Sequence, residues 1–409
     1  MKSEWMITLL TAGGILILCA AMIIWDKIRQ RKWFLRHLKQ RWGTIPDREY
    51  TQEELESISH YARRHEGEPF MIDDITWNDL QMDEIFIRMN NTLSSCGEDV
   101  LYQMLRQPQM HREVLEERER LIAYFQTHEE ERIQVLTRVK EVKKIWKMSI
   151  ADYIDALKDV DRTGRAKYPM LAGLSVAAII ATLIKPIPCM FLLLLMLCVS
   201  AVVHTRDSKK IEPYLNCFVC ILRLLRAADQ FEKLDNPVIQ TYLDRIREGR
   251  KKMKSFRRGA FLVASTNSVQ DGLEAIVVSY LRIIFQVDFI KFYSMLKHVE
   301  GNEAIIEDMY QAIGELDALI AVASFRESLP YYSLPEFTET DNAEGASLEV
   351  EELYHPLIAD PVVNGIRMQR GVLITGSNAS GKSTFLKTIA INTILAQTVH
   401  TCIAKQYRG

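Results

Sequence analysis

Apolar residues recur at the spacing of an amphipathic helix through most of the first 330 positions. The segments 47–67 and 111–146 carry apolar residues three and four positions apart, with mixed charge on the opposite face. The buried stripe predicted for 111–146 consists of Val114, Leu115, Leu121, Ile122, Phe125, Ile133, Val135 and Leu136. Further helices are predicted over Ile211–Lys252, Gly272–Val299 and Asn302–Arg326, so this part of the chain is expected to be all-α.

Two longer apolar stretches are of the kind that crosses a bilayer. Residues 6–25, MITLLTAGGILILCAAMIIW, are uncharged over about the length that a membrane-spanning helix needs. Residues 168–203 form a second apolar region, which the sequence Lys-Pro-Ile-Pro at 185–188 divides into two short halves, and a helical hairpin or a re-entrant loop is predicted there. The alternatives are a cleaved signal peptide for the first stretch and a buried hairpin of a soluble domain for the second.

Basic residues indicate which side of a membrane each flank would occupy. Before the first stretch stands Lys2 alone, and after it stand Lys27, Arg29, Arg31, Lys32, Arg36, Lys39 and Arg41. The second stretch has basic residues on both flanks, namely Arg162, Arg165 and Lys167 before it and Arg206, Lys209 and Lys210 after it. By the positive-inside rule, the expectation is a multi-pass protein of the cell membrane with its N-terminus outside and the bulk of the chain in the cytoplasm.

The pattern changes from helical to mixed near Ser347, after a loop rich in Pro, Glu and Thr. Residues 348–358, LEVEELYHPLI, and 365–376, GIRMQRGVLITG, alternate or run apolar in short bursts bounded by turns, which predicts strands. Residues 382–397, KSTFLKTIAINTILAQ, predict a helix. The expected fold is therefore mainly α, with transmembrane helices, followed by the start of an α/β domain.

Charge and cysteine content narrow the function classes. The net charge of −2 and the pI near 6.5 provide no global positive field, so nucleic acid or anionic membrane would have to bind at local patches. The odd, scattered set of seven cysteines does not resemble a disulfide framework. Cys217 and Cys220 form a C-x-x-C pair without a second pair or a histidine cluster, and two residues on one face of a helix explain it better than a zinc site.

A phosphate-binding signature stands between the predicted strand GVLIT and the predicted helix. It follows G-x-x-x-x-G-K-[ST] and consists of Gly376, Ser377, Asn378, Ala379, Ser380, Gly381, Lys382 and Ser383, with Thr384 next to it. The glycines let successive backbone N–H groups face one anion, and the helix N-terminus adds its own N–H groups and dipole. Lys382 would neutralise nucleotide phosphates and Ser383 would ligate Mg²⁺, so ATP and Mg²⁺ are the expected cofactors.

Acidic residues do not follow this signature. Hydrolysis needs an acidic Mg²⁺ ligand and a group that activates water, usually at the end of a later strand. Residues 385–409 contain no Asp or Glu. The sequence therefore predicts nucleotide binding, identifies no catalytic residue, and leaves ATPase activity of this chain uncertain.

A basic run at 244–261, DRIREGRKKMKSFRRGAF, is the second candidate site. Arg245, Arg247, Arg250, Lys251, Lys252, Lys254, Arg257 and Arg258 cluster there. Arg250, Lys251, Lys252, Lys254, Arg257 and Arg258 are the candidate contacts to DNA phosphates or to anionic lipid. A solvated helix face is the third interpretation.

These motifs together resemble the MutS family of DNA mismatch-repair ATPases, and specifically its membrane-anchored bacterial relatives. YHPLI at 354–358 and the segment 362–404 are similar to the opening of that family's ATPase domain. Ser377 stands where the family has proline, Ala379-Ser380 where it has Met-Gly, and 401–404 where it has a Val-Pro-Ala element. Upstream, 72–108 and 115–125 resemble the start of the family's helical core, and 313–325 resembles the helix that returns to the ATPase domain.

The resemblance implies six parts in the chain. These are an N-terminal anchor with its basic flank at 1–45, a first part of the helical core at 46–167, the hairpin at 168–204, a second part of the core at 205–330, a linker at 331–346 and the beginning of a P-loop ATPase domain at 347–409. Two family parts have no counterpart, namely the mismatch-reading domain with its G-x-F-x-E wedge and the second half of the ATPase domain.

The resemblance also implies a function. It suggests a membrane-tethered ATP-binding protein that handles DNA as a homodimer, without direct mismatch reading. It also implies a C-terminally truncated product or an incomplete gene model of a longer ATPase. The alternative is a non-enzymatic membrane scaffold or an inactive truncated product, and a small-molecule kinase is a weaker third. Salt-dependent DNA binding would separate the first function from the other two.

Overall fold

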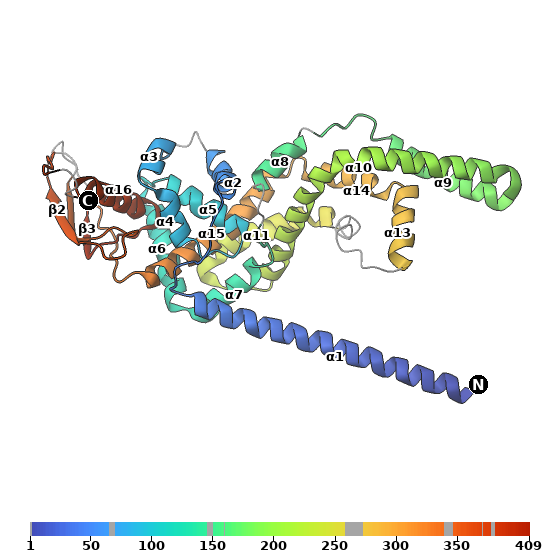
Figure 1. Cartoon of the computed structure of the whole chain (residues 1–409), viewed down its shortest axis with the longest axis horizontal. Helices are drawn as coiled ribbons and strands as arrows, with labels where there is room; N and C mark the ends of the chain where they lie inside the picture. The colour runs from blue at the N-terminus through green and yellow to red at the C-terminus, as the bar shows by residue number, and fades with distance from the viewer. Residues whose placement is uncertain are drawn as a thin grey trace.

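The computed structural model describes residues 2–64, 70–144, 150–158, 160–257, 273–338, 347–369, 371–377 and 381–409. A helical body occupies the middle of an elongated molecule (Figure 1). A small sheet with one helix lies at one end, and long helices project from the other end. The C-terminus is therefore at the opposite end of the molecule from the N-terminus.

The helices predicted from the pattern are present. The body contains α2 (Gln52–Arg63), α3 (Asp74–Asp79), α4 (Met82–Met89), α5 (Ser95–Arg106), α6 (Arg112–Thr127), α7 (Glu129–Val139), α8 (Ile150–Lys158), η1 (Pro237–Ile239), α11 (Gln240–Lys252), α13 (Leu273–Ile284), α14 (Val287–Val299) and α15 (Glu303–Ser328). Four of them begin at a residue whose side chain caps the helix, namely α2 at Thr51, α3 at Asp73, α5 at Ser94 and η1 at Asn236. Thr51, for example, forms a capping box with Glu54 at the start of α2.

The predicted stripe on 111–146 is mostly buried, and Ile133 is partly buried. Leu115, Leu121, Ile122, Phe125, Val135 and Leu136 lie in the core. Val114 is 38% exposed, so its prediction as a core residue is wrong. The reason is helical geometry, because Leu115 is about 100° further round the helix and takes the position that faces the core.

The centre of the body is a close crossing of α5 and α15. Glycine is required on both helices, because a Cβ at Gly314 would lie 2.5 Å from the Cys96 carbonyl oxygen and one at Gly97 would lie 2.3 Å from a carboxylate oxygen of Asp317. Asp317 is fully buried and accepts hydrogen bonds from the Ser94 hydroxyl (2.6 Å) and the Ser94 backbone N–H (3.0 Å). This carboxylate on α15 therefore holds Ser94, the residue that caps the N-terminus of α5.

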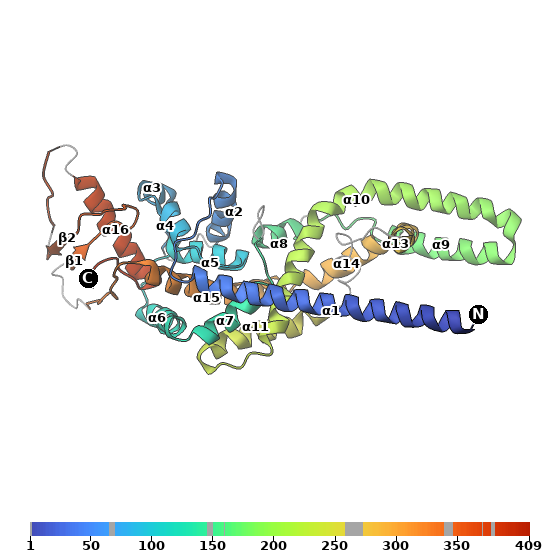
Figure 2. The same ribbon diagram turned by 60° about the horizontal axis from the view of Figure 1, so that its bottom comes forward.

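Three long helices project from the body in the same direction (Figures 1 and 2). They are α1 (Lys2–Arg41) and the antiparallel pair α9 (Lys167–Ile184) and α10 (Pro186–Phe231), which turn at Lys185. Within the described residues, Lys167–Ile184 and Pro186–Glu212 are long and apolar enough to cross a membrane, and 17% and 6% of these segments are buried. The second apolar region is thus a projecting hairpin of two helices and not a core element.

The C-terminal region forms an antiparallel sheet with one helix. The strand order is β2 (Asn364–Met368), β1 (Leu348–Leu353), β3 (Gln406–Arg408), and both neighbours pair antiparallel with β1. The helix α16 (Lys382–Val399) packs on the body side of this sheet (Figure 1). Ser333 and Glu336, from the predicted linker, also bond to the sheet region, at Cys402 and Tyr407.

One predicted strand is wrong. Residues 371–377, which contain GVLIT, have no strand structure, and Val372 and Leu373 are 50% and 87% exposed. No strand of the described chain pairs with 371–377, although β2 and β3 are the edge strands of the sheet. An isolated strand cannot satisfy its backbone groups within a sheet, so these residues run as an open segment.

Candidate functional site: a phosphate loop seated on the helical body

The phosphate loop approaches the N-terminus of α16 through a left-handed turn. Gly381 has φ 82°, and a Cβ there would meet no atom within 4 Å. Glycine permits this backbone without strain, and the turn leads into the first N–H groups of α16, which have no partner within the helix. Ser383 and Thr384 are exposed beside it. Of the predicted loop residues, Asn378, Ala379 and Ser380 lie outside the described part of the chain.

Lys382 folds back over the loop that precedes it. Its ammonium group donates hydrogen bonds to the carbonyl oxygens of Gly376 (2.7 Å) and Ser377. The cation is therefore held above the loop and close to the helix N-terminus. Of the predicted loop residues, Lys382 thus contacts Gly376 and Ser377, and Gly381 precedes it at the start of α16.

These residues fit part of a nucleotide site. A helix N-terminus with an adjacent ammonium group favours an anion such as a phosphate. The Ser383 hydroxyl stands on the first turn of α16, where a ligand to Mg²⁺ would be needed. The open segment 371–377 differs from the buried strand that usually leads to such a loop, so the geometry supports phosphate binding more strongly than a complete nucleotide pocket.

The helix α16 is fixed to the helical body along its length. Near its start, Lys387 donates hydrogen bonds to the carboxylate of Asp79 (2.9 Å) and to the Asp79 carbonyl oxygen (2.5 Å). Near its end, the Gln109 backbone N–H bonds to the Gln397 carbonyl oxygen (2.8 Å), and Arg118 bonds to the Thr398 carbonyl oxygen. The phosphate loop and the body are thus linked through this one helix.

Arg326 is the central contact at the end of α16. This side chain is 1% exposed and reaches the Glu119 carboxylate with both terminal nitrogens (2.6 and 3.0 Å). It also donates to the hydroxyl of Thr401 (2.8 Å) and to the carbonyl oxygen of His400 (2.9 Å). A buried guanidinium thus satisfies acceptors on α6 and at the C-terminus of α16 at once.

The Glu119 carboxylate has a second hydrogen-bond partner, because His400 Nδ1 lies 3.2 Å from one of its oxygens. Burial by itself would raise the pKa of Glu119, but the hydrogen bonds from His400 and Arg326 outweigh it and hold that pKa below its usual range. Sequence reasoning missed this group. The available signal was a lone arginine at the end of the apolar run ALIAVASF in 318–325.

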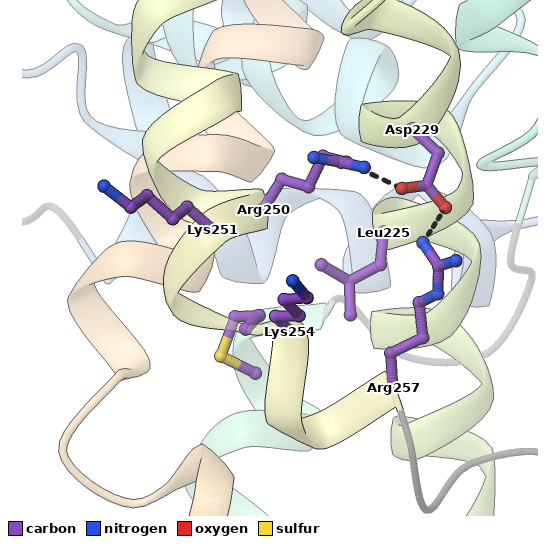
Figure 3. A pocket seen from close by; sticks show the side chains of 7 residues that line it. Leu225, Asp229, Arg250, Lys251, Lys254 and Arg257 are labelled. Atoms are coloured by element: carbon purple, nitrogen blue, oxygen red, sulfur yellow. Dashed lines mark hydrogen bonds and ion pairs between the residues drawn. The ribbon is translucent and has the colours of Figure 1, made fainter.

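The basic run forms a second candidate site. A cavity of about 390 Å³ between α10 and α11 is lined by Leu225, Asp229, Arg250, Lys251, Met253, Lys254 and Arg257. Figure 3 shows these side chains. Asp229 accepts from Arg250 Nε (2.7 Å) and from Arg257. The structure therefore brings together four of the six predicted basic contacts.

The other basic residues of this run face elsewhere. Lys252 pairs with Glu248 at 2.6 Å, and Arg258 lies outside the described residues. Arg245 pairs with Asp308 and Glu315, and Arg247 with Asp244. Cys217 and Cys220 are buried, and no group of three metal-ligating side chains occurs in the described residues.

Comparison with known proteins relates part of this chain to mismatch-repair proteins. A segment of 118 residues, 27% of the chain, is 34% identical to the DNA mismatch repair protein MutS of Haloquadratum walsbyi and covers 12% of it. A segment of 154 residues, 35% of the chain, is 29% identical to the DNA mismatch repair protein MutS of Persephonella marina and covers 17% of it. A segment of 125 residues, 29% of the chain, is 30% identical to the MutS protein homolog 4 of Homo sapiens and covers 12% of it.

No protein-family model matches the chain. The matched segments span less than a fifth of the length of these relatives. All of these matches are to MutS proteins, and they support a relation between this chain and the MutS family over about a quarter to a third of the length of this chain.

Proposed function

We propose that this chain is a membrane-tethered, MutS-like ATP-binding protein whose phosphate loop is Gly376–Thr384. The observation that carries the proposal is the position of Lys382, whose ammonium group is held over the loop at the N-terminus of α16. Lys382 and the N–H groups of α16 would hold the phosphates, and Ser383 would hold Mg²⁺. Bound Mg²⁺ would neutralise phosphate charge.

The contacts of α16 give such binding a route to the helical body. A change at the loop would move a helix that is bonded to Asp79 at one end and to Arg326 at the other. Because both contacts are specific hydrogen bonds, the helix can transmit a shift as a rigid element. In a dimeric protein of this kind, the body would pass the shift to DNA or to a second copy.

Membrane tethering is supported by the projecting helices. Leu183, Ile187, Phe191 and Val202 on the hairpin are more than 60% exposed, and Met22 and Trp25 on α1 are similarly exposed. An apolar surface of this extent is unfavourable in water and favourable in lipid. Because α1 and the hairpin project from one end of the body, a single bilayer could take both (Figure 2).

A non-enzymatic membrane scaffold is the second candidate. It is favoured by one observation, the open and exposed segment 371–377 where a nucleotide-binding fold has a buried strand. A scaffold would need the hairpin and the body but not the loop. Nucleotide affinity separates the two candidates.

The test is equilibrium binding of Mg·ATP to the full chain in detergent. Removal of a charge-assisted contact to phosphate by Lys382→Ala should weaken binding by about 10- to 100-fold. The matched control is Lys405→Ala, which removes an exposed lysine that pairs with Glu352 at the surface. Saturable binding that is lost only in Lys382→Ala supports the proposal, and absence of binding in the unmodified chain favours the scaffold.

DNA binding is proposed from the relation to MutS proteins, and it has its own test. Affinity for DNA should fall steeply as salt rises, because basic side chains release counterions when they meet phosphates. Charge reversal within the basic run then identifies the ligand. A loss of DNA binding with vesicle binding intact assigns the run to DNA, the opposite result assigns it to lipid, and no loss of either shows that the run serves neither.

A further inference from the structure

We propose that the cavity between α10 and α11 binds a compact phosphorylated small molecule. The cavity is separate from the phosphate loop, since it is formed by the C-terminal part of α10 and the C-terminal part of α11 with the residues that follow it (Figure 3). The inference does not depend on nucleotide binding at Gly376–Thr384.

The charge of the cavity selects an anion. Four cationic side chains and one carboxylate line it. Asp229 is shared between Arg250 and Arg257, and Arg250 also pairs with Glu232 at 2.7 Å. Lys254 also lines the cavity, and Lys251 lies at its edge with its side chain extending away from Asp229 (Figure 3). The positive charge at the mouth therefore exceeds what the protein itself neutralises.

The arginines are held in position before any ligand arrives. Asp229 binds one nitrogen of each guanidinium, which orients both planes around the cavity. Each guanidinium has five N–H donors, so donors remain for a second acceptor. A phosphate group accepts several such bonds, and less conformational entropy is lost when the arginines are already fixed.

The walls add an apolar surface. Leu225 and Met253 line the cavity and are 2% and 1% exposed. A cavity of about 390 Å³ falls within the range of small-ligand pockets. Its chemistry thus fits a molecule with a phosphate at one end and an uncharged part at the other.

The distribution of charge disfavours a nucleic acid strand. A strand presents phosphates at regular intervals and requires a continuous basic track. Here Arg245, Arg247 and Lys252 are each neutralised by an acidic neighbour, so the excess charge is confined to the cavity. A compact anion matches this arrangement better than a polymer.

The position of the cavity disfavours lipid headgroups. Leu225 lies about six helical turns, or about 30 Å, beyond His204 along α10, and His204 stands at the end of the apolar region. Headgroups of the bilayer that holds the hairpin would therefore lie far from Lys251 and Lys254. A ligand from the aqueous phase would reach them directly.

The experiment uses the full chain in detergent, in a Lys382→Ala background that removes the lysine of the phosphate loop. The probe is inorganic triphosphate, measured by isothermal titration calorimetry. We expect one saturable site, weakened at least about tenfold by the double change Lys251→Glu and Lys254→Glu. The matched control is Lys252→Glu on the same helix, which should leave the affinity unchanged.

Three results would overturn the proposal. The first is no saturable triphosphate binding, and the second is binding that the double change leaves intact. The third is a chain that does not bind triphosphate but binds a single-stranded oligodeoxynucleotide or phosphatidylglycerol vesicles. In that case Lys251 and Lys254 would be required for the binding. Thermal melting of each variant checks the fold, and all three lysines are exposed, so the substitutions leave the core intact.

Discussion

Replacement of Arg326 by methionine should release the phosphate-loop helix from the helical body. Methionine keeps most of the side-chain length and removes every donor. The change leaves the Glu119 carboxylate with His400 as its partner, and it leaves the carbonyl oxygen of His400 without its 2.9 Å hydrogen bond. The variant therefore removes a contact and keeps the packing volume.

The expected loss of free energy of unfolding follows from the burial of the Arg326–Glu119 ion pair. Removal of one partner of a buried ion pair costs about 3–5 kcal/mol. Glu119 is 18% exposed and retains His400, which places this site near the lower limit, at about 3 kcal/mol. The loss is local, because Arg326 joins the body to residues 399–401.

Hydrogen exchange of residues 382–399 is the assay, since local opening is measured there directly. A loss of about 3 kcal/mol corresponds to exchange about 100-fold faster in α16. Arg245→Met is the matched control, because this arginine also forms ion pairs, with Asp308 and Glu315, but lies between α11 and α15. Unchanged protection of α16 in Arg326→Met would refute the reasoning.

Three further predictions follow from the packing, the buried charge and the hairpin. Gly314→Ala should destabilise the body by about 1–3 kcal/mol, because the new Cβ would meet the Cys96 carbonyl oxygen. Gly173→Ala is the control, since a Cβ at Gly173 would have no atom within 4 Å and should not destabilise the protein. Thermal melts compare the two variants. Burial raises the pKa of Asp317 to about 6, against opposing hydrogen bonds from Ser94 and Leu93. Because this pKa is raised above its unfolded value, the folded state is most stable while the carboxyl is protonated, and stability falls as pH rises through about 4 to 6. The melting temperature of Asp317→Asn should therefore depend less on pH in that window than the melting temperature of the unmodified chain. Equal slopes of melting temperature against pH in the two proteins would contradict this. The chain should remain in the pellet after alkaline carbonate extraction of membranes, and release of the intact chain into the supernatant would argue against tethering.

Much of the fold was predictable because its signals are local. The helical segments followed from apolar spacing, and α16 followed from the sequence after the phosphate signature. The hairpin was also predictable, since Lys185 and Pro186 interrupt an otherwise apolar region and the helices turn there. These features depend on nearest neighbours in sequence, which pattern analysis captures.

The remaining features depend on contacts between distant residues. An apolar run such as GVLIT predicts a strand, but a strand forms only where a partner strand pairs with it, and no described strand pairs with 371–377. Arg326 joins residues more than 70 positions apart, and no local pattern specifies such a partner. The basic run was predicted as one patch, yet only the structure shows that Lys252 pairs with Glu248, that Arg250 and Arg257 converge on Asp229, and that the Lys251 side chain extends away from Asp229 (Figure 3).

The most direct test of nucleotide binding uses an ATP derivative whose γ-phosphate carries a transferable acyl group. Such a reagent acylates an amine that lies against the phosphates, so peptide mapping identifies the lysine in the site. We expect acylation at Lys382 that excess Mg·ATP suppresses, because this ammonium group is held over the loop. Acylation spread over exposed lysines such as Lys251 and Lys405, with no effect of ATP and no preference for Lys382, would contradict a nucleotide site at this loop.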